Sequence, residues 1–172
     1  MSVPPAVGSV IGQLPTAITN SLNKEVIAEM ANATQVIKSL TPTVASVLDA
    51  LATFPDDETI NASNKFLLVS KADYVTLIKD AIAKSQYVKD NTNTSGLGSV
   101  CGVPVYVSAL LAQGTAYLAT KEAVTVFMKK GYGVETDRDI EKRATTMVAN
   151  TVNVVALTDA KKVVKLDKTA AG

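Results

Sequence analysis

The C-terminal part of the chain joins a dense charge cluster, Glu135-Thr-Asp-Arg-Asp-Ile-Glu-Lys-Arg143, to an uncharged stretch, Thr145-Thr-Met-Val-Ala-Asn-Thr-Val-Asn-Val-Val-Ala-Leu157. A polar break at Thr158-Asp159 separates that stretch from a short apolar segment at 163–166. Valine and threonine are β-branched and favour extended backbone, so this pattern predicts one long strand and one short closing strand. No nucleophilic, metal-binding or phosphate-binding pattern occurs here. A long strand beside dense charge instead suits strand pairing and contact with partners.

Composition sets the first limits on what the chain can do. Its 172 residues are 47% hydrophobic and predict one domain, or two small intimate ones, with a real core. Only 19% are charged and the formal net charge is +1, so a basic nucleic-acid-binding face is not indicated. A net charge so near zero also removes one defence against self-association.

The residues needed for most catalytic and metal sites are scarce. The chain has no histidine, which excludes Ser-His-Asp and Cys-His mechanisms and histidine-dependent metal sites within it. The single cysteine, Cys101, cannot form an intrachain disulfide, and we expect a small buried residue in a strand. The consecutive acids Asp56, Asp57 and Glu58 follow Pro55 and indicate a solvated turn. We therefore predict no enzyme, no cofactor, no metal and no small-molecule substrate.

Targeting signals are also lacking in the sequence. Its N-terminus has no basic start or unbroken apolar core, so no signal peptide is predicted, and no window approaches a membrane span. Residues 1–15 contain Pro4, Pro5 and Pro15 with two glycines, which indicates an arm or linker.

Apolar spacing predicts three helices. The first runs from Ser21 to Leu40, with apolar residues at spacings of three and four. The second follows Thr41-Pro42, with Thr41 as its cap. Ser70 and Asp73 form a capping-box pattern that opens the third helix, which carries Tyr74, Leu77, Ile78 and Ile82.

The remaining segments are predicted to be strands and loops. Strands are expected at 65–69, at 102–108 with Pro104 at an edge or strand start, at Tyr117-Leu118 and at 123–128. Residues 90–98 indicate a loop, and Gly131 and Gly133 are expected to turn the chain into the charged segment. This order of helices and then strands predicts an α+β fold.

Several passages together carry a family resemblance. They are Lys65-Phe-Leu-Leu-Val-Ser-Lys-Ala-Asp-Tyr74, Gly98-Ser-Val-Cys-Gly-Val-Pro-Val-Tyr-Val-Ser108, Gly114-Thr-Ala-Tyr-Leu118, Asp137-Arg-Asp139 and the strands to Leu166. In this order they resemble the C-terminal part of a tailed-bacteriophage or prophage major capsid protein of the Hong Kong ninety-seven-type shell fold. Family members normally carry an N-terminal arm and a long loop before the spine helix. Only about twenty residues precede Ser21, so either the chain is truncated or processed, or the domain stands alone.

The resemblance implies an organisation of the chain. Residues 1–20 would be an arm or linker, 21–42 and 134–172 a peripheral-type subdomain with the spine helix, and 43–133 an axial-type α/β subdomain. The peripheral-type subdomain would be closed by the C-terminal strands.

The resemblance also implies a structural role. The chain would be a head subunit that self-associates, as hexamers and pentamers in a full icosahedral shell around packaged DNA. The chain would also contact scaffold and portal proteins and, non-specifically, DNA. It would be made in the bacterial host cytoplasm and end in the virion head. The alternative is a non-enzymatic binding or adaptor module that reuses the domain in a phage particle. The candidate subunit-contact residues are Glu135, Asp137, Arg138, Asp139, Glu141, Lys142 and Arg143.

Overall fold

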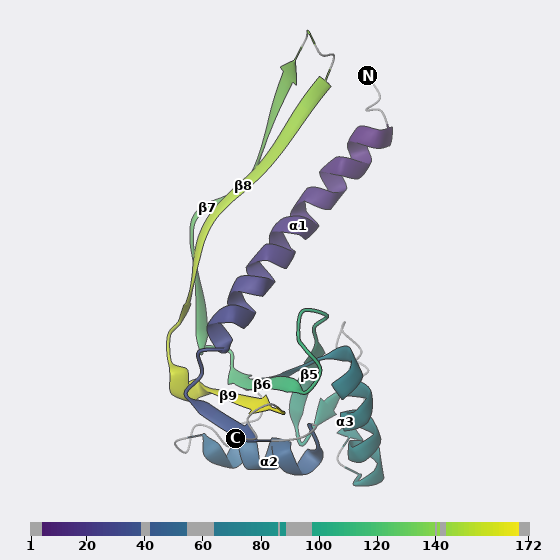
Figure 1. The fold of residues 1–172 in the computed structure, drawn as a ribbon, viewed down its shortest axis with the longest axis vertical. Coiled ribbons are helices and arrows are strands. Elements are labelled where there is room, and N and C mark those ends of the chain that lie inside the picture. The colour runs from purple at the N-terminus through teal and green to yellow at the C-terminus, as the bar shows by residue number, and fades with distance from the viewer. Residues whose placement is uncertain are drawn as a thin grey trace. The chain divides into compact units, whose positions relative to one another are not determined.

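The computed structural model describes residues 5–38, 42–54, 64–85, 87–88, 98–139, 141 and 144–168 (Figure 1). Its helices are α1 (Pro5–Met30), α2 (Val44–Thr53) and α3 (Lys71–Ala83), with a short 3-10 turn, η3, at Ala160–Lys162. Its strands are β1 (Gln35–Lys38), β2 (Lys65–Val69), β3 (Tyr87–Val88), β4 (Ser99–Val100), β5 (Val103–Val107), β6 (Thr115–Thr120), β7 (Val124–Asp139), β8 (Ala144–Leu157) and β9 (Val163–Asp167). The predicted α+β class is confirmed.

The chain divides into two compact units. The smaller contains Met1–Val26 and Thr125–Ala156, and the larger contains Ile27–Val124 and Leu157–Gly172. This division differs from the predicted subdomain boundaries, because β1 and β9 both pair within the sheet of the larger unit. The predicted segments 21–42 and 134–172 are therefore each split between the two units.

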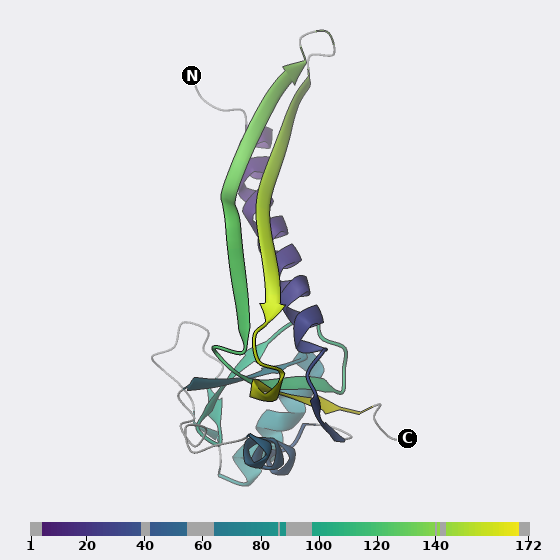
Figure 2. The same cartoon turned by 90° about the vertical axis from the view of Figure 1, so that its left-hand side faces the viewer.

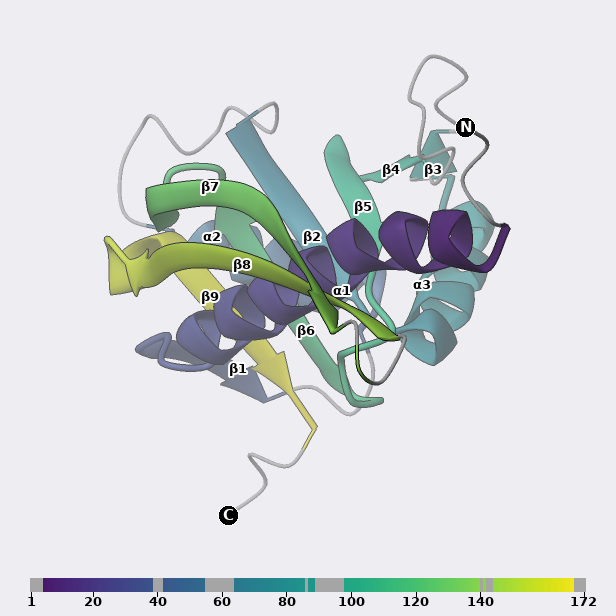
Figure 3. The same cartoon turned by 90° about the horizontal axis from the view of Figure 1, so that it is seen from above.

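The larger unit is built on a mixed seven-stranded sheet. Its strand order is β1-β9-β6-β2-β5-β4-β3, and its middle strands run side by side in Figure 3. β6 is antiparallel to both β2 and β9, whereas β1 pairs with β9 and β2 with β5 in parallel. The core lies between one face of this sheet and helices α2 and α3. Leu67, Leu118 and Val164 from that face are fully buried together with Val47 of α2 and Leu77 of α3.

The two short helices begin where hydrogen bonds fix their first turns. Thr43, not the predicted Thr41, caps α2 in a reciprocal capping box with Ser46, and residue 41 lies outside the described residues. Asp80 of α3 accepts a hydrogen bond from the backbone N–H of Val44 at 2.8 Å, so one helix supplies an acceptor for the free N-terminus of the other. The predicted cap of α3 is confirmed, because the Ser70 hydroxyl accepts from the Asp73 N–H.

The first predicted helix was wrong at both ends. Helix α1 begins at Pro5, so the residues 5–15 expected in an arm are helical, and proline is well tolerated at a first helical position. The helix ends at Met30, and residues 35–38 form β1 instead of its last turns. Val36 and Ile37 are β-branched and lie opposite Lys165 and Leu166 of β9, so strand pairing prevails over the helical spacing.

Three turn and strand predictions were also corrected. Gly131 and Gly133 lie inside β7 and do not turn the chain. Cys101 is a partly exposed turn residue, because Cys101 and Gly102 have φ values of 53° and 77° and join β4 to β5 as a two-residue hairpin turn of the I′ kind. Pro104 is the second residue of β5, near a strand start as expected, but β5 lies between β2 and β4 and is not an edge.

Other predictions hold or fall outside the described chain. The strands predicted at 65–69, 145–157 and 163–166 are β2, β8 and β9 within one residue at each end. The Asp56–Glu58 turn and most of the loop at 90–98 lie outside the described residues. Ile82 of α3 is 59% exposed and does not join the core.

Asp73 links α3 to the turn before β6, and its loss should destabilise the larger unit. Its buried carboxylate accepts hydrogen bonds from the Ser70 hydroxyl and from the Gly114 N–H, each at 2.7 Å. Asp73→Ala leaves that N–H without an acceptor, so we expect the free energy of unfolding in urea to fall by about 2 kcal/mol. Asp49→Ala, at an exposed α2 position, should change it by less than about 0.5 kcal/mol. Equal effects of the two changes would contradict this role.

Asp80 should make stability sensitive to acid. The hydrogen bond from Val44, and then that from Lys84, lower the pKa of Asp80 below its ordinary value. The carboxylate therefore stabilises the fold fully above the carboxyl's unfolded-state pKa, and this contribution is lost as pH falls through the lowered folded pKa. In urea denaturation between pH 7 and pH 3, Asp80→Asn should lose less stability on acidification than the wild type. Parallel pH profiles would contradict the assignment.

Candidate subunit-contact surface

Metal-ligating side chains are scattered over the described residues. Within the described ranges, no three His, Cys, Asp or Glu side chains lie close enough to share a metal ion. No helix among them is both long and apolar enough to cross a membrane. Burial raises the pKa of the Cys101 thiol, which keeps it protonated and poorly nucleophilic at neutral pH.

Lys65 of β2 is a buried lysine. Its side chain is 1% exposed, and its ammonium lies 5.2 Å from the centre of the Phe54 ring. Burial lowers the pKa of Lys65, while a cation above an aromatic face is partly stabilised. The Lys65 ammonium is thus buried and partly stabilised by an aromatic ring. This contact explains Lys65 as a structural residue of the larger unit.

The smaller unit contains the long strand that the sequence predicted, paired with a second long strand. Strands β7 and β8 form a two-stranded ribbon of 16 and 14 residues. Helix α1 lies along one face of the ribbon (Figure 2), where the Asn153 amide of β8 donates to the Glu25 carboxylate of α1 at 2.7 Å. Successive strand residues point to opposite faces, so Met147, Ala149 and Asn153 share the face toward α1.

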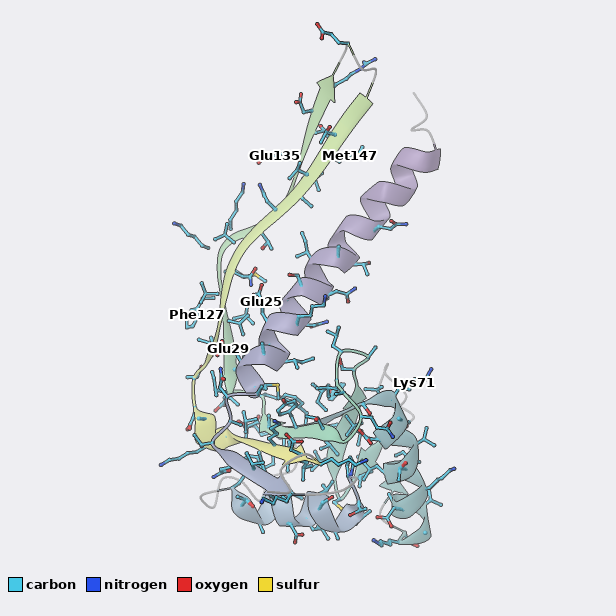
Figure 4. The ribbon with its side chains drawn as sticks, viewed as in Figure 1. Glu25, Glu29, Lys71, Phe127, Glu135 and Met147 are labelled. Atoms are coloured by element: carbon cyan, nitrogen blue, oxygen red, sulfur yellow. The ribbon has the colours of Figure 1, made fainter. Side chains whose placement is uncertain are left out.

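The opposite face of the ribbon carries exposed apolar side chains. Val148, Val152 and Val154 of β8 alternate with the α1-facing residues and are 51%, 46% and 62% exposed. Phe127 and Met128 near the start of β7 are also exposed, but as consecutive strand residues they point to opposite faces; Figure 4 labels Phe127 beside this strand. A contiguous exposed apolar patch is one sign of a contact surface.

The predicted contact residues lie toward the far end of β7. Glu135, Asp137 and Arg138 are exposed on the strand, Asp139 ends it, and Glu141 is exposed in the turn that follows. Lys142 and Arg143 lie outside the described residues, and so does the side chain of Asp139. The charge cluster is therefore largely a strand end, and not a segment that precedes the strands.

Of the predicted residues, Glu135 has a defined setting. Its carboxylate lies 3.6 Å from the Lys130 ammonium and accepts from the Asn150 amide at 3.3 Å. Gly133 is beside them, where an added Cβ would lie 3.1 Å from the Asn150 amide oxygen. The Asn150–Glu135 hydrogen bond joins β8 to β7. The Lys130–Glu135 ion pair lies within β7, and because it is exposed it adds little stability.

Reasoning from the sequence missed the apolar part of this surface. Phe127, Val148, Val152 and Val154 were read only as strand formers, although the alternation of the three valines with Ala149, Thr151 and Asn153 was visible. Alternation predicts that one face of a strand is buried, but it does not tell whether a face is covered by the same chain.

Three kinds of comparison place this geometry among known proteins. A family model described as "Phage capsid protein" matches residues 2–166. No curated protein matches the sequence significantly. Many solved structures match it, and those described next are representative.

The solved structures share the fold at low sequence identity. The capsid of the cyanophage P-SCSP1u is 12% identical with a TM-score of 0.72, over 97% of this chain and 66% of that chain. The holo-SrpI encapsulin complex from Synechococcus elongatus is 15% identical with a TM-score of 0.68, over 92% and 65%. The mature capsid of bacteriophage PhiM1 is 11% identical with a TM-score of 0.66, over 99% and 67%. The chain thus spans about two thirds of these chains or slightly less, and the predicted capsid fold is confirmed.

The charged strand end should be dispensable for folding. Because Asp137 and Arg138 are exposed, replacing both with alanine should change the free energy of unfolding in urea by less than about 0.5 kcal/mol. A loss above about 1 kcal/mol would show that these side chains support the fold and are not free for a partner.

Proposed function

The chain belongs to the phage capsid protein family, and on that premise we propose that it is a structural subunit of a bacteriophage or prophage head, a major capsid protein that self-associates into a shell around packaged DNA. The family is a structural class, so a head location follows from membership. The proposal extends this to assembly by the chain itself. The family match over residues 2–166 is the observation that carries it.

The family match is needed because the fold serves more than one kind of particle. The encapsulin complex has a TM-score of 0.68 against this chain, close to those of the phage capsids. The fold therefore supports the role of a shell subunit, and the family model favours the phage head among shells. The alternative of a binding or adaptor module gains no support from either comparison.

The proposal includes the partners and the absence of catalysis. We expect copies to form hexamers and pentamers, with scaffold, portal and non-specific DNA contacts, after synthesis in the bacterial host cytoplasm. We expect no turnover, because a shell subunit needs repeated contacts and no acid, base and nucleophile set. Many weak, repeated contacts in a closed symmetric assembly give high overall avidity.

The two units take distinct parts in this proposal. The smaller unit, with α1 and the β7–β8 ribbon, would be the peripheral-type subdomain with its spine helix. The larger unit, with the seven-stranded sheet, would be the axial-type subdomain. The charged end of the ribbon, from Glu135 to Arg143, would contact neighbouring subunits, where charges set specificity and encounter rate more than affinity.

Self-association of the gene product tests the proposal. Sedimentation velocity across protein concentration, in high salt or with a crowding agent, should show concentration-dependent oligomers. Strictly monomeric behaviour under all these conditions would contradict the shell role. Assays with divalent metals and generic ester and phosphate substrates should show no turnover, and sustained turnover would contradict the non-enzymatic role.

A further inference from the structure

The strands of the described chain differ in how their unpaired edges are protected. β1 and β3 are the outer strands of the seven-stranded sheet, and β7 and β8 each keep one unpaired edge in the ribbon. An unpaired edge offers a row of free N–H and C=O groups to another strand. Proteins usually protect such edges by shortness, by charge, or by a covering element.

Three of these edges are protected in those ways. β1 has four residues and ends in the exposed Lys38, and β3 has two residues. β7 is long, but it carries Lys129, Lys130, Glu135, Asp137 and Arg138. Charges of both signs along one strand disfavour pairing with a second strand that is not matched to them.

β8 has none of these protections. Its 14 residues, ATTMVANTVNVVAL, include no charge, no proline and no glycine. Valine and threonine dominate, and these residues favour strand pairing. Its outward-facing valines are about half exposed or more, whereas its other face lies toward α1. Charged residues are therefore absent from β8, at one edge of the ribbon, and concentrated on β7, at the other edge.

We infer that β8 pairs edge to edge, antiparallel, with β8 of a second copy of this chain, which joins two ribbons into a four-stranded sheet across a two-fold axis. This contact rests on the proposed function and specifies one of the interfaces that self-association requires. A second copy is the occupant because an uncharged strand pairs with its own sequence without placing like charges opposite each other.

The length of β8 leaves two symmetric registers, because centring the axis on Thr151 overlaps residues 145–157 and centring it on Asn150 overlaps 144–156 equally. We take the register on Thr151, because it places the two most exposed valines of the strand opposite each other. Val148 then lies opposite Val154 of the second copy, Asn150 opposite Val152, and Thr151 opposite itself. The two residues of each pair are both even-numbered or both odd-numbered, so they point to the same face of the joined sheet. The exposed valines of both copies therefore lie on one face, and the faces toward α1 of both copies form the other.

The interface also fits the rules for symmetric association. A two-fold contact uses the same patch on both copies, and here one strand supplies the whole patch. Addition of a strand to an exposed edge is a common mode of recognition, in which backbone hydrogen bonds supply affinity and alternate side chains supply specificity.

Paired cysteines test the register directly. In a Cys101→Ser background, full-length Val148→Cys and Val154→Cys proteins are prepared with different tags, alone and co-expressed, and then oxidised. Antiparallel partners have Cα separations of about 4.5 to 5.5 Å, within disulfide range. We therefore expect a mixed disulfide dimer only from co-expression. Each variant alone should not cross-link, because its two copies of the cysteine would be roughly 20 Å apart along the strands.

Charge replacement tests the same pairs without cysteine. Val148→Lys with Val154→Lys places two like-charge pairs in the contact and should weaken dimerisation by about tenfold or more in sedimentation. Val148→Lys with Val154→Glu creates two opposite-charge pairs and should restore it. Val75→Lys on α3, a valine that is 49% exposed, is the matched control and should have no effect.

The outcomes separate this inference from the proposed function. A mixed disulfide with charge rescue supports β8 pairing. Oligomers that form without the mixed disulfide, or that are indifferent to the charge pattern, overturn the inference and leave the shell role standing. A chain that stays monomeric and does not cross-link overturns both.

Discussion

A two-stranded ribbon leaves the backbone groups along both outer edges without partners in the sheet, and it cannot cover its own faces. Isolated two-stranded sheets are marginally stable in water, and each strand of β7–β8 keeps one edge unpaired. Helix α1 covers one face of the ribbon, anchored by the Asn153–Glu25 hydrogen bond, while the valines of the other face remain exposed. The unpaired edge and the exposed valines are the features of the smaller unit that the proposed assembly would cover.

The larger unit covers one face of its sheet, and keeps its unpaired edges short, within the chain itself. Its sheet buries one face against α2 and α3, and its outer strands are two and four residues long. The buried carboxylate of Asp73 on α3 accepts a hydrogen bond from Gly114, before β6. One unit is therefore stabilised by its own core and has short outer strands, whereas the other has a long uncharged strand edge. That contrast suits a subunit whose function is contact with its neighbours.

Local signals predicted much of this fold from the sequence. The capping pattern at Ser70, the apolar run at 65–69 and the β-branched stretch to Leu157 each became the expected element. The first helix was misplaced because residues 35–38 satisfy helical spacing, and only pairing with β9 makes them a strand. The charge cluster was found, but its place within β7 was not, because Gly131 and Gly133 were read as a turn. The exposed valines of β8 were missed, since alternation cannot distinguish a core face from an interface.

Hydrogen–deuterium exchange along β8 tests the central claim most directly. The measurement compares the amides of residues 145–157 in dilute, monomeric protein with the same amides in concentrated, assembled protein. Formation of a four-stranded sheet predicts slower exchange at alternate amides, those that face outward from the ribbon in the monomer. The amides of β2 and β6, already paired within the larger unit, should not change. Unchanged exchange along β8 in assembled protein would contradict the account.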